Sequence, residues 1–362
     1  MSDSYPAFPP GKAVIFNGHG EPFEFVTKEV PLLKTGEILV KTIYTTLCGS
    51  DIHTYCGRRM EPPHVVLGHE IVGDIIWIDP SHSRKDFNGE SIAIGDRITW
   101  SIFAVPEGIE APRPDMPQKS TPLFKYGHVS SEGNNVFNGG LADYCIIQSN
   151  TALIKLSPAV PVKVAATISC AHSTVMGGVR VAGDISGKKV LVIGAGLLGL
   201  SCVAMCREAG AYWIGLADID QNRLIWGKKF GTDDEYVITG DNNFQIDHEV
   251  DIVFDMTGNA NAMRMGIDLL SIGGIAVWIG AVYPGKPVEI DAQKIVRKML
   301  QIRGLYNYNY DDFVNATAFI ESNHDKYPFE ALVEEEYTLD KVEEAFAYAT
   351  DKKPVRVGVK IN

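Results

Sequence analysis

The residues with the clearest capacity for chemistry are two cysteines and one histidine, namely Cys48, His69 and Cys170. Cys48 opens the segment CGSDIH, His69 lies in the apolar run VVLGHEIVGDI, and Cys170 lies in SCAHST. Two thiolates and one imidazole leave one position of a tetrahedral zinc open, which is how catalytic zinc is held. Nothing local in the sequence joins the three residues. A core thiol at Cys48 and a buried, hydrogen-bonded His69 therefore remain alternatives.

A glycine-rich segment carries the second chemical signal. The stretch GAGLLG follows the apolar run KKVLVI and opens an apolar segment with helical character. Glycines in this spacing permit a tight turn, a close approach of pyrophosphate to the backbone and close packing of helix on strand, and the helix N-terminus offers N–H groups to the anion. The alternative is a glycine turn that binds nothing. The cofactor-binding residues predicted here are Gly194, Gly196, Leu197, Leu198 and Gly199.

An acidic residue strengthens the interpretation of this segment as a dinucleotide site. Asp218 lies near the end of the next apolar strand, AYWIGLADID. A carboxylate at this place accepts hydrogen bonds from the ribose hydroxyls and repels a 2′-phosphate, so we expect NAD rather than NADP. Arg223 follows closely and weakens this discrimination, because an arginine can accommodate the 2′-phosphate.

The composition excludes several other functions. The 362 residues include 33 basic and 45 acidic side chains, for a net charge of −12, which argues against a nucleic-acid or anionic-membrane surface. No run approaches the roughly 18 apolar residues of a membrane span, and the N-terminal segment lacks the apolar core of a signal peptide. Six cysteines are too few for a disulfide framework in a chain of this size. We therefore expect a soluble, cytoplasmic protein.

The elements that must position these residues fall into two regions. Above roughly 250 to 300 residues a chain usually splits into domains, so we expect two. Short β-branched runs dominate the first 150 residues, and a proline-rich, loop-like segment interrupts them. After residue 160, apolar strands alternate with helical segments, which predicts a parallel sheet and an α/β fold. Strands are expected at 12–18, 36–49, 69–79, 95–103, 141–148, 188–193, 211–220, 250–259, 273–282, 300–306 and 354–362, and helices within 161–183, 194–210, 308–323 and 338–351.

The motifs CGSDIH, GHEIVGDI and GAGLLG, followed by Asp218, resemble the zinc-dependent medium-chain dehydrogenase/reductase family of alcohol and polyol dehydrogenases. The resemblance spans nearly the whole chain. It implies a Rossmann doubly wound parallel sheet, which binds NAD, and a β-rich GroES-like catalytic domain. The Rossmann domain is expected at 161–305, and the discontinuous catalytic domain at 1–160 and 306–362.

The same resemblance assigns roles to the residues that match. It makes Cys48, His69 and Cys170 the ligands of one catalytic zinc, with Glu70 as an alternating fourth ligand or a group behind the metal. Zinc is then expected to act as a Lewis acid toward the substrate alcohol, whose proton leaves through Ser50, a ribose hydroxyl of the cofactor and His53 while a hydride moves to NAD. The remaining roles implied are Asp51 orienting the histidine ligand, Ser50 and His53 relaying the proton, Arg356 near the pyrophosphate and Thr174 near the nicotinamide.

One departure from the family concerns a second metal. Many relatives hold a structural zinc with four closely spaced cysteines in a loop after the G-D-R motif. The corresponding loop of this chain, 103–139, contains no cysteine, so we expect no structural zinc. Packing of the proline-rich loop or a subunit contact is expected to stabilise it instead.

The substrate is the least defined part of the prediction. Arg58 and Arg59 follow the expected relay histidine and suit an anionic group, although a solvated surface pair is the alternative. The segments CGSDIHTYCGRR and LGHEIVG also resemble a branch of the family linked to phosphonate catabolism, which implies a hydroxyalkyl phosphonate. A polyol, of the sorbitol or threonine type, is the competing substrate.

Three hypotheses for the function remain open. The first is a zinc-dependent, NAD-linked alcohol dehydrogenase that acts on a small molecule, with no nucleic-acid or membrane partner, as a homodimer or homotetramer. The second is a zinc-free reductase of the same fold that acts on enones or quinones. The third is a non-catalytic NAD-binding protein. Metal content separates the first two, and NAD turnover with a panel of alcohols separates both from the third.

Overall fold

The computed structural model describes residues 6–133, 135–239 and 246–361. The chain forms two compact units, and each is discontinuous in sequence. The first comprises residues 1–170, 320–324 and 329–362, and the second comprises 171–319 and 325–328. The sequence prediction placed the change of domain at residue 160 and the return at 306; those limits stay a prediction. Asn134, inside the predicted loop 103–139, lies outside the described residues.

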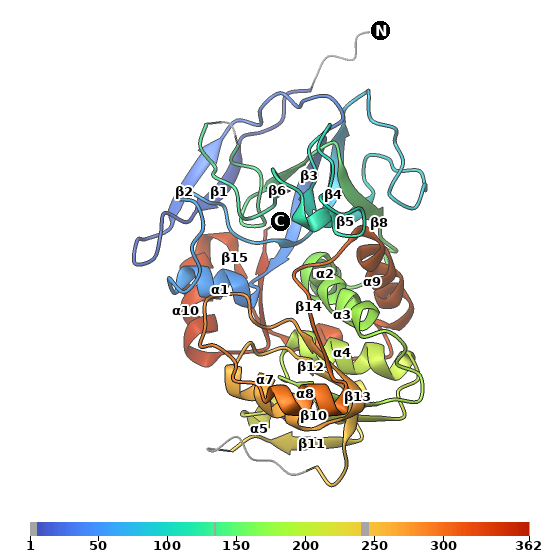
Figure 1. The fold of residues 1–362 in the computed structure, drawn as a ribbon. Helices are drawn as coiled ribbons and strands as arrows, with labels where there is room; N and C mark the ends of the chain where they lie inside the picture. The colour runs from blue at the N-terminus through green and yellow to red at the C-terminus, as the bar shows by residue number, and fades with distance from the viewer. Residues whose placement is uncertain (1–5, 134, 240–245, 362) are drawn as a thin grey trace. The chain divides into compact units, whose positions relative to one another are not determined.

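The second unit is built on a six-stranded parallel sheet (Figure 1). The strand order is β11-β10-β9-β12-β13-β14: the chain adds strands on one side of β9 first and then on the other side, beginning with β12. The carboxyl ends of β9 and β12 therefore flank the switch point where such sheets bind ligands. The strands are nearly continuous runs of buried apolar residues, as expected for a sheet covered on both faces. They are β9 (Lys189–Ile193), β10 (Trp213–Asp218), β11 (Asp234–Val237), β12 (Val250–Asp255), β13 (Leu270–Trp278) and β14 (Gln301–Gly304).

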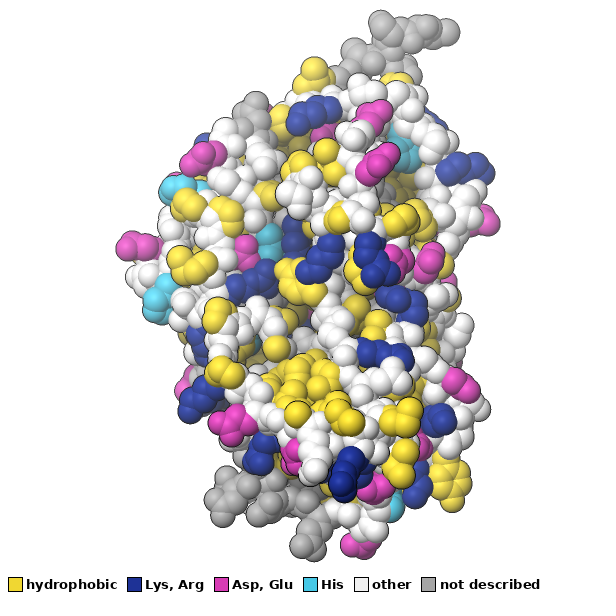
Figure 2. All heavy atoms as spheres, viewed as in Figure 1, with side chains coloured by type: hydrophobic (Ala, Val, Ile, Leu, Met, Phe, Trp, Pro, Cys, Tyr) yellow, Lys and Arg dark blue, Asp and Glu magenta, His cyan; other side chains and the backbone are white. Residues whose placement is uncertain are grey.

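Helices connect these strands and cover them. The helices are α3 (Ser173–Ala182), α4 (Leu197–Glu208), α5 (Gln221–Leu224), α6 (Gly227–Phe230), α7 (Ala260–Asp268), α8 (Ala292–Lys298) and α9 (Tyr310–Asn323), the last of which crosses the boundary between the units. Hydrophobic side chains gather in one patch on the face where α8 lies (Figure 2). Val296 and Met299, which are 75% and 73% exposed, belong to the α8 segment.

The first unit is β-rich, and its main sheet is largely antiparallel. The path β15-β16-β3-β4-β5-β6 is extended by β7 on β3 and β8 on β5, and β1 pairs with β2 separately. The strands are β1 (Gly11–Ile15), β2 (Glu24–Lys28), β3 (Ile38–Thr46), β4 (Glu70–Ile78), β5 (Arg97–Ala104), β6 (Phe124–Lys125), β7 (Tyr144–Ile147), β8 (Thr151–Lys155), β15 (Val333–Thr338) and β16 (Arg356–Lys360), and the helices are α1 (Gly49–Tyr55), α2 (Val162–Thr167) and α10 (Val342–Lys352).

The sheets confirm the predicted α/β class, a doubly wound parallel sheet joined to a β-rich domain. Every predicted strand overlaps an observed one, and helices occur in all four predicted segments. The sequence analysis missed the short strands β2, β6, β8, β11 and β15, which have exposed or charged residues or lie beside the proline-rich loop. It also missed the π-helix at Ile168–His172, which separates α2 from α3.

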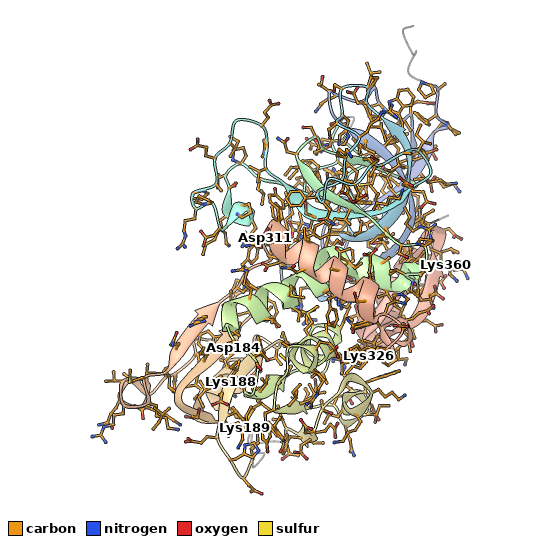
Figure 3. The ribbon with its side chains drawn as sticks, turned by 90° about the vertical axis from the view of Figure 1, so that its right-hand side faces the viewer. Asp184, Lys188, Lys189, Asp311, Lys326 and Lys360 are labelled. Atoms are coloured by element: carbon orange, nitrogen blue, oxygen red, sulfur yellow. The ribbon has the colours of Figure 1, made fainter. Side chains whose placement is uncertain are left out.

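Two further observations concern the surface. No helix among the described residues is long and apolar enough to cross a membrane. A pocket of about 350 Å³ lies at the amino ends of β9, β12 and β13, and its lining includes Asp184 and Lys188. These two residues lie near one another at the start of β9 (Figure 3). The pocket is therefore at the opposite end of the parallel strands from the glycine turn.

Candidate metal and cofactor sites

The three predicted metal ligands come together in the first unit. Their ligand atoms, the sulfurs of Cys48 and Cys170 and a ring nitrogen of His69, all lie within 4.8 Å of one another. Cys48 lies two residues after the end of β3 and caps α1, and His69 directly precedes β4. Cys170 lies in the π-helix, a distortion that often occurs at functional sites. Each ligand is thus held at the end of an element or at an irregularity, where its orientation is fixed.

Asp51 lies beside the imidazole of His69. It is 2% exposed, and its Oδ1 lies 3.2 Å from Nδ1 of His69, while its Oδ2 accepts a hydrogen bond of 2.9 Å from the backbone N–H of Cys48. Burial disfavours the imidazolium, but the Asp51 carboxylate outweighs burial and raises the pKa of His69 to about 10. With Nδ1 directed at Asp51, Nε2 is the nitrogen left to bind a metal.

The pKa values of the two cysteines are shifted in opposite directions. A hydrogen bond from the thiol of Cys170, helped by the charge of Arg356 and opposed by burial, holds the pKa of Cys48 well below its usual range. The pKa of Cys170 is raised well above its usual value by the same contact and by burial. A thiolate and a neutral imidazole are the forms that bind zinc, and binding releases the remaining protons. The donor set, its spacing and its carboxylate-held histidine fit a tetrahedral zinc site with one open position.

Glu70 lies in a buried ion pair that the sequence analysis missed. Its two carboxylate oxygens accept hydrogen bonds of 3.0 Å from Nε and Nη2 of Arg356, and Oε2 also accepts one from the hydroxyl of Thr46. Nη2 of Arg356 lies 3.7 Å from the sulfur of Cys48. Burial raises the pKa of Glu70 to about 7, although Arg356 opposes the shift. The predicted contacts of Glu70 with zinc and of Arg356 with pyrophosphate stay predictions.

The two residues predicted to relay the proton, Ser50 and His53, both lie on α1. The hydroxyl oxygen of Ser50 lies 3.3 Å from Nε2 of His69. His53, one turn further along α1, is partly buried. Burial, and then the positive charge of Arg58, lower the pKa of His53 below its ordinary value. His53 is therefore neutral at pH 7 and able to accept a proton.

The glycine turn of the second unit has the form that a pyrophosphate requires. Gly194 has a φ of +107°, and a Cβ at Gly199 would lie 1.7 Å from the carbonyl oxygen of Gly194. Only glycine permits this turn and this approach of helix to strand. A Cβ at Gly196 would meet no atom closer than 3.9 Å, so the backbone is open there. The helix that begins at Leu197, with Leu198 in its first turn, directs its free N–H groups at this space.

Asp218 lies at the carboxyl end of β10, as the sequence predicted. It ends β10, is 8% exposed, and its Oδ2 accepts a hydrogen bond of 2.6 Å from the backbone N–H of Ala195. The carboxylate is thus held against the glycine turn. Arg223 is also close, because its Nη1 is the atom that would lie 3.9 Å from a Cβ at Gly196. Thr174 is buried in the first turn of α3, and its predicted role near the nicotinamide stays a prediction.

The structure adds residues beside the metal ligands that motif reading did not find. The ring of His128 lies 4.9 Å from that of His69, and Glu61 lies close to both His128 and Arg59. Of the two arginines predicted to bind substrate, Arg59 is partly buried in this group and Arg58 is exposed. The segment FKYGH, charged and aromatic inside a loop, was the available signal for His128, but sequence alone does not indicate which loop folds onto the metal ligands.

Comparisons with known proteins agree with this architecture. Residues 34–158 match the alcohol dehydrogenase GroES-like domain, and residues 198–322 match the zinc-binding dehydrogenase domain. An L-threonine 3-dehydrogenase from Pyrococcus horikoshii is 29% identical over 347 residues, which cover 89% of this chain and 90% of that protein. Among solved structures, an alcohol dehydrogenase from Thermotoga maritima superposes with a TM-score of 0.89 at 22% identity, covering 98% of this chain and all of that one.

A zinc-binding dehydrogenase from Sinorhizobium meliloti, solved with NADP, has the same fold, with a TM-score of 0.84 at 20% identity and coverage of 98% and 100% of the two chains. A Rossmann-like sheet, a GroES-like domain and a Cys-His-Cys metal site together define a zinc-dependent dehydrogenase, an oxidoreductase that acts on CH–OH groups. The chain belongs to the zinc-containing medium-chain alcohol dehydrogenase family.

Proposed function

We propose that the protein oxidises a polar small-molecule alcohol with NAD as the hydride acceptor, and catalyses the reverse reduction. The observation that carries the proposal is the convergence of Cys48, His69 and Cys170, with the histidine oriented by Asp51 and a serine hydroxyl 3.3 Å from its free nitrogen. A structural zinc site would use all four ligand positions, whereas this set leaves one for a substrate.

Different residues of the chain are assigned to substrate activation and to proton transfer. Zinc, when bound, supplies Lewis-acid chemistry toward the alcohol oxygen. Ser50 lies where it can accept the substrate hydroxyl proton, and neutral His53, on the same helix, can take that proton toward solvent. NAD, when bound, would supply the acceptor for a hydride from the carbinol carbon, so that the substrate would lose two electrons and two hydrogens in all.

A preference for NAD is part of the proposal. The support is Asp218, whose carboxylate is held at the glycine turn and would lie against the charge of a 2′-phosphate. Arg223, near Gly196, acts in the opposite direction. One relative of this fold was solved with NADP, so the choice varies within the fold and must be measured as a ratio of kcat/KM for the two cofactors.

For the substrate we propose a hydroxyalkyl phosphonate, with a polyol or a 3-hydroxy amino acid of the threonine type as the second candidate. Arg59 beside the metal ligands supports an anionic substrate. The second candidate is favoured by the relatives named as L-threonine 3-dehydrogenases, which are 24–29% identical to this chain.

The test combines metal analysis with turnover. The protein is purified, loaded with zinc, and assayed for NADH formation with hydroxyalkyl phosphonates, polyols, 3-hydroxy amino acids and simple alcohols. We expect one zinc per chain, with none in the cysteine-free loop, and activity that a chelator abolishes and zinc restores. A metal-free chain that turns over an enone or quinone would indicate the zinc-free reductase, and NAD binding without turnover of any alcohol would indicate a non-catalytic protein.

We also propose that the protein is a homodimer or homotetramer in the cytoplasm. β14 is an edge strand of the parallel sheet, and the hydrophobic side chains of Val296, Met299 and Ile302 near it are exposed. An unpaired edge next to apolar surface is a suitable contact for a second copy. Light scattering of the purified protein measures the state directly, and a monomer at micromolar concentration would contradict this proposal.

A further inference from the structure

A group of charged side chains lies beside the metal ligands in the first unit and takes no part in the proton and hydride transfers described above. It consists of Arg59, Glu61, Lys125 and His128, which we call the charged cluster. The side chains of Arg59, Glu61 and His128 are only 17%, 9% and 8% exposed. Burying charged groups costs free energy, so a cluster like this one next to a reaction centre requires an explanation.

The loop that contains Gly127 brings His128 close to the metal ligands. Gly127 has a φ of +72°, and a Cβ there would lie 2.6 Å from the carbonyl oxygen of Gly68. Only a glycine allows the loop to pass this close to the segment that carries His69. As a result, His128 packs on the ring of His69, and its backbone N–H donates a hydrogen bond of 3.1 Å to the carbonyl of Lys125.

Arg59 is held near the same cluster by contacts with α1 and with Glu61. Its backbone N–H donates a hydrogen bond of 3.2 Å to the carbonyl of His53, at the end of α1. Its Nε lies 2.9 Å from Oε1 of Glu61, and Nε2 of His128 lies 3.7 Å from the same oxygen. Oε1 of Glu61 is buried and lacks a well-aligned hydrogen bond, so the ion pair is close but poorly directed.

The charges of the cluster favour an anion as its partner. Arg59 and Lys125 carry two positive charges, while Glu61 carries the single carboxylate, and both cations act electrostatically on it. The chain as a whole has a net charge of −12, so an excess of positive charge here runs against its average. Arginine is the side chain best suited to the paired oxygens of carboxylates and phosphonates.

We propose that Arg59 and Lys125 form the recognition site for an anionic group of the substrate, either a carboxylate or a phosphonate, while the substrate hydroxyl lies beside Ser50 and His69. Glu61 is a positioning residue that holds Arg59 in place. This inference rests on the proposed function, because it names the class of alcohol that the same site accepts.

The experiment uses three secondary alcohols that share a carbon skeleton. They are 3-hydroxybutyrate, 2-hydroxypropylphosphonate and 1,3-butanediol, which differ only in carrying a carboxylate, a phosphonate or a neutral hydroxymethyl group. NAD-linked kcat/KM is measured for each with the zinc-loaded protein. Calorimetry of methylphosphonate and acetate, which have no carbinol to oxidise, gives a readout of anion binding that does not depend on turnover.

Arg59→Met and Lys125→Met are the test variants, and Lys28→Met is the matched control. Lys28 is exposed on β2, so its replacement changes the net charge equally without touching the cluster. Each cation would contribute a charge-assisted hydrogen bond to the anion, so each test variant is expected to lose about ten- to a hundredfold in kcat/KM for the anionic alcohols. The diol should change by less than about threefold. Arg59→Lys should recover part of the loss.

The double variant Arg59→Met with Glu61→Gln guards against misfolding, because it leaves no unpaired carboxylate in the cluster. It should fold and still lose the preference for anions.

Equal losses on the diol and the anions, or a wild-type enzyme that prefers the diol, would overturn the inference while leaving the dehydrogenase function intact. Binding of methylphosphonate or acetate that depends on Arg59, in a protein that oxidises no alcohol, would instead refute the proposed function and keep the anion site. A larger loss for the phosphonate than for the carboxylate identifies the phosphonate as the natural group.

Discussion

Replacement of Asp51 by asparagine tests whether the carboxylate behind His69 prepares the metal site. Asp51 is 2% exposed and lies 3.2 Å from Nδ1 of His69. Asparagine has the same shape and keeps one oxygen for the backbone N–H of Cys48. Its amide group, however, would donate to Nδ1 and favour the tautomer that has its proton on Nε2. That nitrogen could then no longer bind zinc.

The expected size of the effect follows from this contact. Removing a carboxylate that orients a metal-bound histidine typically costs 10- to 100-fold in metal affinity or activity. That range corresponds to about 1.4–2.8 kcal/mol of binding free energy. Because Asp51 also accepts hydrogen bonds from the backbone, we expect a loss of thermal stability as well, but it should be no larger than for another buried aspartate with backbone partners.

The assay is competition for zinc against a chromophoric chelator, with unfolding followed in parallel by circular dichroism. Asp86→Asn is the control, because Asp86 is 7% exposed and accepts hydrogen bonds from three backbone N–H groups away from the metal ligands. Asp51→Asn should weaken zinc binding and Asp86→Asn should not. Unchanged zinc affinity in a folded Asp51→Asn protein would falsify the assigned role of Asp51.

Three further predictions concern the proton path, the cofactor and the buried ion pair. Burial and the charge of Arg58 lower the pKa of His53, so the activity should fall only at a pH below the ordinary imidazole range, where His53 becomes protonated. Arg58→Gln should raise that pKa and move the acid limb of the kcat/KM profile to higher pH; an unmoved limb would exclude His53 as its source. Asp218→Gly should raise kcat/KM for NADP relative to NAD by about tenfold or more, and an unchanged ratio of the two cofactors would contradict the role of its carboxylate. Arg356→Met leaves the carboxylate of Glu70 buried without its ion pair, so the free energy of unfolding, measured in urea at pH 8, should drop by about 3–5 kcal/mol. At pH 5 the drop should be smaller, because a carboxyl with a pKa of about 7 is protonated there. Equal losses at both pH values would show that the charge of Glu70 is not the cause.

Local sequence was sufficient to predict many of the strands, the glycine turn and the metal ligands. The apolar runs that became β9, β10, β12 and β13 need no partner information to be recognised, because strands buried on both faces are apolar throughout. The G-x-G-x-x-G spacing is equally local: the turn at Gly194 and the close packing at Gly199 depend only on neighbouring residues. The motifs around Cys48 and His69 likewise identified the family, and the predicted fold class and metal ligands agree with the structure.

Other features depend on contacts between residues far apart in the chain. Nothing near Glu70 in sequence indicates that Arg356 is its partner, since β16 reaches β4 only through the sheet order that places β3 between them. The strands missed by pattern reading, such as β2 and β15, have exposed or charged faces and are held by pairing with neighbours rather than by their own hydrophobicity.

The metal and cofactor sites could be predicted from local sequence, whereas the substrate site could not. Sequence determined that two thiolates, an imidazole and a dinucleotide turn are present, because each belongs to a short motif whose residues act through their own type and spacing. Only the tertiary structure decided that the loop with Gly127 brings His128 onto His69, and that Glu61 holds Arg59 beside the metal site. A substrate site is assembled from side chains of different loops, and the positions of loops are set by packing rather than by local sequence.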